Sequence, residues 1–319
     1  MEAILKRRKN SGVRRVAILK AVMSRVHMEN MENLKDFAKT WLLPPRVLHL
    51  VLQLQRRIAA WAIFNSEDRR LLRKNVLLKD RHIGRRCFIL GAGLSVKLQD
   101  IKKLKNEFVI SVSNTFVHQD IPYIRPCYHV TPPLLSSHGH YYAEDSFVEW
   151  LRQMEVGTFD AEMFFHIGDR EFIERNQLFK NRVIHWVDYV PWSGRMNTPV
   201  DLAKVPDIWS VSEFAVTIAV YLGFDKIYLI GIDHDWFNGP LVYFYDHTKQ
   251  HALRPKSGNL RDMGIDAEFQ MRRHADIFHK YKYLYSIKKN IYNANANPNH
   301  YMDVFPKVDY DALFDASGR

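Results

Sequence analysis

The sequence of 319 residues predicts an α/β protein: a single Rossmann-like domain with a mainly parallel sheet, a lid segment and an N-terminal helical extension. Three observations predict this architecture. From residue 81 onward, short apolar runs alternate with helix-compatible stretches, the order that a parallel sheet covered on both faces requires. The most apolar run, residues 226–232, has the composition of a central parallel strand. Gly91 and Gly93 follow the first apolar run, where a nucleotide-binding turn would lie.

Residues 1–80 are predicted to form a basic, amphipathic helical extension. They hold 18 Lys and Arg against 7 Asp and Glu, so the whole net charge of +11 lies in this segment. Residues 1–28 alternate basic clusters with apolar side chains, and the Pro44-Pro45 pair opens a second, apolar helix that ends near residue 64. Apolar faces flanked by Arg and Trp suit the surface of an anionic membrane. Packing on the catalytic domain, or on a second copy in a homo-oligomer, is an equally weighted alternative.

The composition also excludes several classes of protein. The basic excess lies outside the predicted folded domain, which argues against a nucleic-acid partner. Two cysteines, Cys87 and Cys127, provide neither a disulfide framework nor metal-ligand spacing, and we expect buried thiols in a reducing cytoplasm. No run approaches the ~20 apolar residues that span a bilayer, and the N-terminus lacks the features of a signal peptide. We therefore expect a peripheral protein at the cytoplasmic face of the cell membrane.

The catalytic domain is predicted to span residues 81–319. Strands are expected at residues 86–90, 108–113, 127–130, 162–167, 182–186, 226–232 and 290–293. Residues 210–223 are predicted to form a helix, because Ser210 can cap its start, apolar residues fill it and Gly223 can end it. A second long helix is expected at residues 265–289.

The residues directly after each strand are the candidate nucleotide-binding residues, because ligands of open parallel sheets bind beyond the carboxyl ends of the strands. Gly91 and Gly93 would let backbone N–H groups approach a phosphate. Asn114 offers a donor and an acceptor to a base or sugar, and Thr131 begins a stiff turn. A structural tight turn and a helix cap are the alternative roles, since the third glycine of a dinucleotide fingerprint and the lysine of a P-loop are both missing.

Two carboxylates follow the most apolar strand. Asp233 and Asp235 have a spacing that can bind a divalent metal, Mg²⁺ or Mn²⁺, holding a nucleotide diphosphate. A hydrogen bond from Asp233 to neighbouring backbone or to a ribose hydroxyl is the alternative. The polar stretch at about residues 235–264, which contains Tyr243, is typical of a mobile lid.

These strand-end residues lie in four blocks: CFILGAGLSVKLQDIKKLKNEFVISVSNTF, CYHVTPP, IWSVSEFAVTIAVYLGFDKIYLIGIDHDWF and IYNANANPNHYMDVFPKVDYDALF. Read in order, they resemble the 6-hydroxymethylpterin diphosphokinase-like family, many of whose members are found in surface-polysaccharide and flagellin-glycosylation systems. They are also similar to the sialyltransferases of glycosyltransferase family 42. The resemblance covers roughly residues 81–314 and is loose between residues 134 and 200.

For the sialyltransferases, the resemblance implies a CMP-activated nine-carbon sugar, inversion at the anomeric carbon and no metal requirement. It implies that Tyr243 holds the departing phosphate. The positions that match nucleotide-binding or strand-end residues of that family are Gly91, Gly93, Ser95, Asn114, Ser210, Gly231 and Asp233.

The chain also departs from the sialyltransferase pattern. Ala92 and Thr131 stand where that family has Asn, Asp207 where it has Arg, and Asp235 where it has a second phosphate-binding tyrosine. A carboxylate there would repel a nucleotide unless a cation intervened, which favours a metal or a different donor. His251 and His274 are the nearest candidates for the general base.

The resulting hypothesis is a glycosyltransferase that moves a sugar, of the sialic-acid type on the resemblance, from a nucleotide-activated donor. The acceptor would be a surface glycan, such as a capsule or lipopolysaccharide chain, or its lipid-linked precursor. His251 or His274 would deprotonate the acceptor, while Tyr243 and helix N-termini stabilise the leaving phosphate. A diphosphokinase that uses Mg-ATP, with Asp233 and Asp235 on the metal, is the first alternative. A non-catalytic subunit of a polysaccharide assembly complex is the second.

Overall fold

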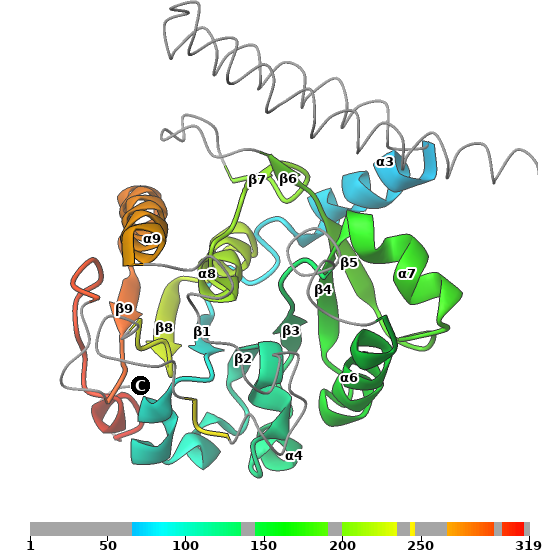
Figure 1. The fold of residues 1–319 in the computed structure, drawn as a ribbon. Helices are drawn as coiled ribbons and strands as arrows, with labels where there is room; N and C mark the ends of the chain where they lie inside the picture. The colour runs from blue at the N-terminus through cyan, green and yellow to red at the C-terminus, as the bar shows by residue number, and fades with distance from the viewer. Residues whose placement is uncertain are drawn as a thin grey trace, which may run out of the picture. The chain divides into compact units, whose positions relative to one another are not determined.

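A computed structural model of the chain describes residues 66–134, 144–190, 200–234, 243–245, 267–296 and 302–315. In these ranges the chain forms an α/β fold around a seven-stranded, all-parallel sheet of Rossmann-like topology (Figure 1). The predicted fold class is confirmed. The helices predicted for residues 1–64 lie outside the described residues.

The strands of the main sheet are β1 (Arg86–Leu90), β2 (Phe108–Val112), β3 (Tyr128–Val130), β4 (Glu162–His166), β5 (Ile184–Val187), β8 (Lys226–Ile230) and β9 (Ile291–Asn293). Each was predicted, with ends that differ by at most two residues. Their order in the sheet is β5-β4-β3-β2-β1-β8-β9, so the direction of winding reverses between β1 and β8. Two short strands, β6 (Tyr189–Val190) and β7 (Val205–Pro206), form a separate parallel pair.

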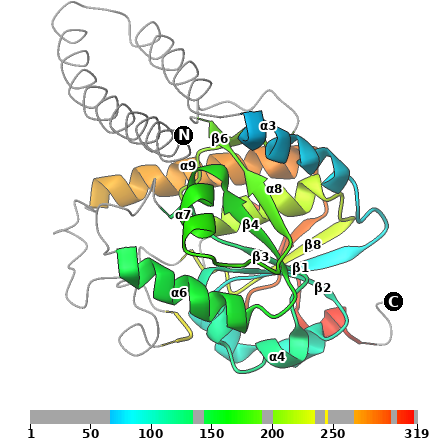
Figure 2. The ribbon, with the colours of Figure 1, turned by 90° about the vertical axis from the view of Figure 1, so that its right-hand side faces the viewer.

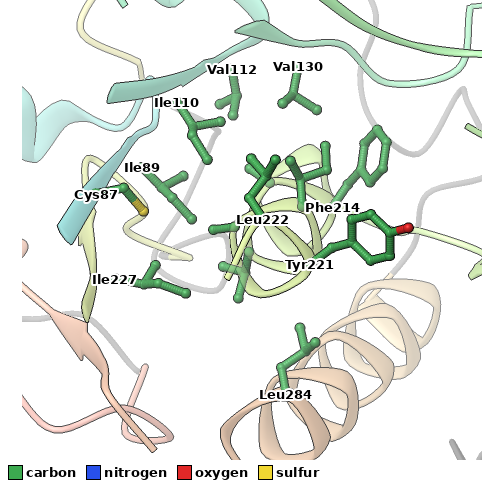
Figure 3. Close-up of a cluster of buried hydrophobic side chains, with 14 of the residues drawn as sticks. Cys87, Ile89, Ile110, Val112, Val130, Phe214, Tyr221, Leu222, Ile227 and Leu284 are labelled. Carbon is green, nitrogen blue, oxygen red and sulfur yellow. The ribbon is translucent and has the colours of Figure 1, made fainter. Parts of the chain in front are cut away.

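One face of the sheet is covered by α8 (Val211–Tyr221), which α9 (Ala267–Ile287) covers in turn. Successive side chains of a strand point to opposite faces, and Cys87 and Ile89 of β1 belong to this core (Figure 3). Phe214 and Ile218 of α8 are fully buried, with an exposed fraction of 0%. α8 is apolar on all sides because it lies between two buried layers.

The other face is covered by several helices and 3-10 turns (Figure 2). Phe88 and Leu90 of β1 pack there with the 3-10 helices η2 (Leu94–Leu98) and η3 (Ile101–Leu104) and with α4 (Ile121–Ile124). Nearer β4 and β5, the core is completed by α6 (Glu144–Gly157), α7 (Arg170–Arg175) and α3 (Ser66–Arg73). The remaining 3-10 turns are η1 (Lys74–Leu78), η4 (Ser113–Val117), η5 (Ile167–Asp169) and η7 (Asp311–Leu313).

Residues 66–80, which the sequence assigned to the extension, pack on the sheet domain. The Asn75 amide donates to the Trp186 carbonyl oxygen at 2.7 Å, and the Asn75 carbonyl accepts from the Tyr221 hydroxyl at 3.0 Å. Asp68 forms an ion pair of 2.8 Å with Arg170. The compact unit that holds the sheet accordingly spans Phe64–Arg319. Across the described residues, every helix is too short or too polar to cross a membrane.

Both cysteines are free thiols, as predicted. Cys87 is fully buried in β1, and Cys127 is partly buried just before β3. Burial raises the pKa of both thiols, which keeps them protonated and unreactive at neutral pH.

A buried ion pair joins α8 to α9. The Lys280 ammonium lies 3.1 Å from a carboxylate oxygen of Glu213, and these side chains are only 4% and 2% exposed. Lys280 also donates to the Asp207 carbonyl, and the Trp209 N–H donates to the same Glu213 oxygen at 2.5 Å. Burial raises the pKa of Glu213, although Lys280 opposes that shift. The pair therefore anchors the segment that leads into α8.

We expect Lys280→Met to lower the free energy of unfolding by about 3–5 kcal/mol at pH 8, because it leaves a buried carboxylate without its cation. Without Lys280, burial alone acts on Glu213 and raises its pKa further, so the folded variant takes up a proton more readily than the unfolded chain as the pH falls, and the buried charge is neutralised. The loss should therefore be smaller at pH 5 than at pH 8. Urea unfolding at both pH values measures it.

The matched control is the double variant Lys280→Met/Glu213→Gln, which removes both charges and should lose this pH dependence. Equal losses for Lys280→Met at pH 5 and pH 8 would contradict the assignment.

Candidate functional site

The candidate site lies where the strand order reverses, beyond the carboxyl ends of β1 and β8. Residues 91–95, Asn114, Thr131 and Asp233 follow β1, β2, β3 and β8, all of which run parallel. These predicted site residues consequently lie at one edge of the sheet, as expected.

Two residues at this edge have a left-handed backbone. Ser113, directly after β2, and His234, beyond β8, both have φ of 48°. Such a conformation is uncommon for residues other than glycine and is found often at functional sites, where surrounding contacts enforce it. Six described residues away from this edge, among them Arg125 and Phe159, share this conformation, so it is not confined to the candidate site.

The glycines at this edge let two turns touch. A Cβ atom added to Gly91 would lie 2.3 Å from the carbonyl oxygen of Gly231, and one added to Gly93 would lie 2.5 Å from a carboxylate oxygen of Asp233. Gly231 has φ of 63°, and its own Cβ would lie 2.3 Å from Val96. Packing of the turns therefore requires all three glycines.

Asp233 fastens these two turns together. One of its carboxylate oxygens accepts the backbone N–H of Ser95 at 3.0 Å, and the other accepts the Ser95 hydroxyl. Asp233 is 4% exposed and Ser95 is 2% exposed. The carboxylate thus caps the start of η2, which is the alternative role that the sequence left open for Asp233.

Most amides of the glycine loop are already used inside the protein. The N–H groups of Gly91 and Gly93 donate to the carbonyls of Ile230 and Gly231, both at 2.8 Å. The Ser95 amide donates to Asp233. A phosphate at this loop would therefore have to bind the amides of Ala92 and Leu94, or side chains.

A short segment of the predicted lid lies on the loop. Tyr243 forms an antiparallel bridge with Gly93, and the Phe244 N–H donates to the Ala92 carbonyl oxygen at 3.1 Å. The rings of Tyr243 and Tyr245 are stacked, with centroids 5.4 Å apart. Two half-buried phenols are thereby placed beside the crevice between β1 and β8.

Asn114 connects this segment to α6. Its amide donates to the Tyr245 hydroxyl at 3.0 Å, and its side-chain oxygen accepts the Trp150 indole N–H at 2.5 Å. Phe244 also packs edge-on against His118, with ring centroids 4.9 Å apart. Asn114 therefore orients Tyr245 as well as ending β2.

A chain of hydrogen bonds links the start of α8 to the end of β8. Ser210 caps α8 by accepting from the Ser212 amide, and the two hydroxyls lie 2.6 Å apart. The Tyr281 hydroxyl donates to Ser212 at 3.1 Å and lies 3.0 Å from Nε2 of His234. His234 can complete this chain by donating from Nε2 to the Tyr281 oxygen. Burial lowers the pKa of His234 to about 3, so this chain stays neutral at physiological pH.

His274 of α9 lies beside this chain, with its ring centroid 6.4 Å from that of His234. Its Nδ1 lies 2.8 Å from the Gln270 carbonyl oxygen, which can only accept, so Nδ1 carries the proton and Nε2 keeps a lone pair. Burial lowers the pKa of His274, which favours the neutral ring. His274 therefore has the protonation state that a general base needs.

Thr131 and the block after β9 have structural roles. The Thr131 hydroxyl is fully buried and donates to the Phe164 carbonyl oxygen at 3.3 Å. Asn295 brackets Ile232, accepting its N–H at 3.0 Å and donating to its carbonyl oxygen at 2.8 Å. These bonds hold the backbone that leads into Asp233.

Several predicted site residues lie outside the described residues. They include Asp235, His251 and the lid at about residues 235–264, apart from residues 243–245. Among the residues that the structure describes, no group of three or more His, Cys, Asp or Glu side chains could hold a metal ion. The predicted pairing of Asp233 with Asp235 on a metal stays a prediction.

Three residues at this edge were not singled out from the sequence: Tyr245, Trp150 and His234. Tyr245 stands two positions after Tyr243, so an extended backbone places the two rings on one side, and this spacing could have indicated it. Trp150 comes from the region of loose resemblance. His234 stands between two aspartates, and the spacing of their carboxylates indicated a metal site but no role for the imidazole.

The chain has no matching family model and no match among curated proteins. Among solved structures it is similar to the sialyltransferase CstII from Campylobacter jejuni, determined in complex with a substrate analogue, cytidine-5'-monophosphate. The identity is 15%, with 71% of this chain and 85% of that chain covered, and the TM-score is 0.35. A likeness at that score extends neither to activity nor to single residues.

We expect Ser95→Ala and Asp233→Asn to be energetically coupled, because each removes part of the hydrogen-bonded contact between these two residues. Ser95→Ala should lower the free energy of unfolding by about 1–3 kcal/mol. In a double-mutant cycle, we expect the two changes to show an interaction of about 1 kcal/mol or more. Denaturant unfolding of the four proteins measures this coupling.

Ser286→Ala is the control, since that hydroxyl is exposed near the end of α9 and contacts only its own helix. If the losses in free energy of unfolding from the Ser95 and Asp233 variants are additive, the two side chains are not coupled and the expected contribution of their contact is contradicted.

Proposed function

We propose that this protein is a glycosyltransferase that moves a sugar from a nucleotide-activated donor, CMP-activated in preference, to a hydroxyl of a surface glycan or its lipid-linked precursor. The observation that carries the proposal is the bridge between residues 243–245 and the glycine loop. It supports a donor site in which paired phenols lie beside the crevice where Rossmann-like folds bind nucleotides. The resemblance of the sequence blocks to CMP-dependent sialyltransferases supports the choice of nucleotide.

In this proposal, neutral hydrogen-bond donors stabilise the leaving nucleotide. Tyr243 donates to the departing phosphate, and Tyr245 is held beside it by Asn114. Donors that are fixed before the reaction need no reorganisation as negative charge develops, so they lower the barrier effectively. The amides between Gly91 and Ser95 that are not used inside the protein would complete the phosphate contacts.

The same proposal assigns the general base to His274, because Gln270 fixes the ring with Nδ1 protonated. His274 is only 3% exposed, so neighbouring side chains must move before an acceptor hydroxyl reaches Nε2. The acceptor hydroxyl oxygen forms the new bond to the anomeric carbon, and its proton moves to Nε2. The bond between that carbon and the phosphate oxygen breaks, and both electrons leave with the nucleotide. His251 remains the second candidate for this role.

Asp233 supports a reaction in which no metal holds the donor. Its carboxylate accepts two bonds from Ser95 and fixes the loop, so its negative charge is already stabilised by donors. The diphosphokinase alternative would need Asp233 to share a magnesium ion with Asp235. The two hypotheses therefore differ in their response to a chelator and to the nucleotide.

We expect CMP to raise the thermal unfolding midpoint by about 5–10 °C at concentrations near 100 times its dissociation constant, with or without EDTA. UDP, GDP and ATP should give smaller shifts. Tyr243→Phe should reduce the CMP shift, whereas Tyr123→Phe, an exposed tyrosine on α4, should not. Differential scanning fluorimetry measures these shifts.

An ATP shift that requires Mg²⁺, with none from CMP, would favour the diphosphokinase. A CMP shift without turnover of any CMP-activated sugar would favour the non-catalytic subunit.

We expect His274→Gln to lower kcat by about 10²–10⁴ while leaving the CMP-induced thermal shift unchanged, because glutamine can hydrogen-bond but cannot accept the proton. Burial lowers the pKa of His274, so the wild-type rate should stay level as pH falls from 8 to about 6.5 and decline only below that. Release of CMP in the presence of an acceptor glycan measures the rate.

His279→Gln is the matched control, since His279 is exposed on the same helix. Equal rates for His274→Gln and wild type would exclude His274 as the base and direct attention to His251.

A further inference from the structure

Residues 74–85 lie at the edge of the sheet opposite the candidate site. They lead from η1 into the start of β1. The amides of Asp80 and His82 donate to the carbonyls of Tyr221 and Leu222 at the end of α8, at 3.0 Å and 2.8 Å. Helices that follow parallel strands end at the amino edge of the sheet, so these bonds place residues 80–82 at that edge. Asn75 places the preceding η1 between the end of α8 and Trp186 of β5.

This segment directs aliphatic side chains outward. Within η1, Asn75 and Leu78 are buried, whereas Val76 and Leu77 are 66% and 79% exposed. Ile83, in the following loop, is 69% exposed. Large apolar side chains gathered on a surface in this way mark an interaction site more often than scattered single ones.

Basic side chains surround these aliphatic ones. Lys74, Lys79 and Arg85 are exposed in the same segment. Other elements repeat the pattern at the amino edge, where the exposed residues include Val183 before β5, Lys226 at the start of β8, and Ile287 and Lys289 at the end of α9. Exposed acidic residues here are Asp80, Asp160, Asp201 and Asp225, and Asp160 is paired with Arg125.

An anionic lipid bilayer fits this combination best. Aliphatic side chains gain by entering the headgroup boundary, and Lys and Arg gain from the negative surface potential. Protein interfaces are depleted in lysine and enriched in aromatic residues. Binding to nucleic acid is dominated by phosphate contacts, which leave exposed aliphatic side chains without a role.

We propose that the amino edge of the sheet docks on an anionic membrane, with Val76, Leu77 and Ile83 entering the headgroup region and Lys74, Lys79 and Arg85 contacting lipid phosphates. This surface belongs to the folded unit Phe64–Arg319. Lys74, Val76, Leu77 and Lys79 stand at the end of the extension to which the sequence assigned membrane contact, whereas Ile83 and Arg85 lie beyond it. The inference does not depend on the reaction that the opposite edge performs.

The test compares full-length proteins in sedimentation with phosphatidylcholine vesicles that contain phosphatidylglycerol. Val76→Thr/Leu77→Gln/Ile83→Gln should lower the partition constant by about tenfold or more, because three apolar side chains are lost. The matched control is Leu98→Gln/Met271→Gln, which changes an aliphatic and a thioether side chain of 69% and 61% exposure on other elements. This control should bind like wild type.

A second variant, Lys74→Gln/Lys79→Gln/Arg85→Gln, tests the charges. Binding to anionic vesicles should fall by about fivefold per charge at low salt, with no change on vesicles of phosphatidylcholine alone. Neither variant should alter the CMP-induced thermal shift, so failure here is separable from failure of the proposed reaction.

Wild-type vesicle binding by both variants would overturn the proposal and assign membrane contact to other parts of the chain. A drop in molar mass in solution, without a change in vesicle binding, would identify the surface as a contact between copies and would equally overturn it.

Discussion

The close approach of two turns, one after β1 and one after β8, is the constraint on which the rest of this edge depends. Gly91 and Gly231 come so near that a single added carbon on either would overlap backbone or core atoms. Asp233 then fastens the turns by accepting two bonds from Ser95. The sheet reverses its winding between β1 and β8, so this contact joins the two turns at the point where the halves of the sheet meet.

The strands were predictable because their composition reflects burial on both faces. The run from Lys226 to Ile230 is apolar after its first residue, as a strand between two covered faces requires. The helix that starts after Ser210 was predictable for a local reason, since the capping serine and the terminal glycine act within a few residues of it. The placement of residues 66–80 differed, because their partners, such as Trp186, are more than 100 positions away. The β6–β7 pair was not predicted either.

The candidate site was less predictable, because its hydrogen bonds join distant parts of the chain. Strand-end positions alone located Asn114 and Asp233, but not what they bind. Asn114 has partners 36 and 131 positions away, and His234 is held by a tyrosine 47 positions away. The glycines illustrate the same limit: their presence suggested free amides, whereas the fold uses two of those amides to pair β1 with β8.

The bridge between Tyr243 and Gly93 is made by backbone atoms, as is the bond from Phe244 to Ala92. Substitution of a side chain in this segment leaves these docking bonds in place. The phenol rings can thus be exchanged while the segment keeps its position, so the chemistry presented at this edge can change by single substitutions on the same backbone. We therefore expect the glycines of the two turns to tolerate few substitutions, and the side chains of residues 243–245 to tolerate more.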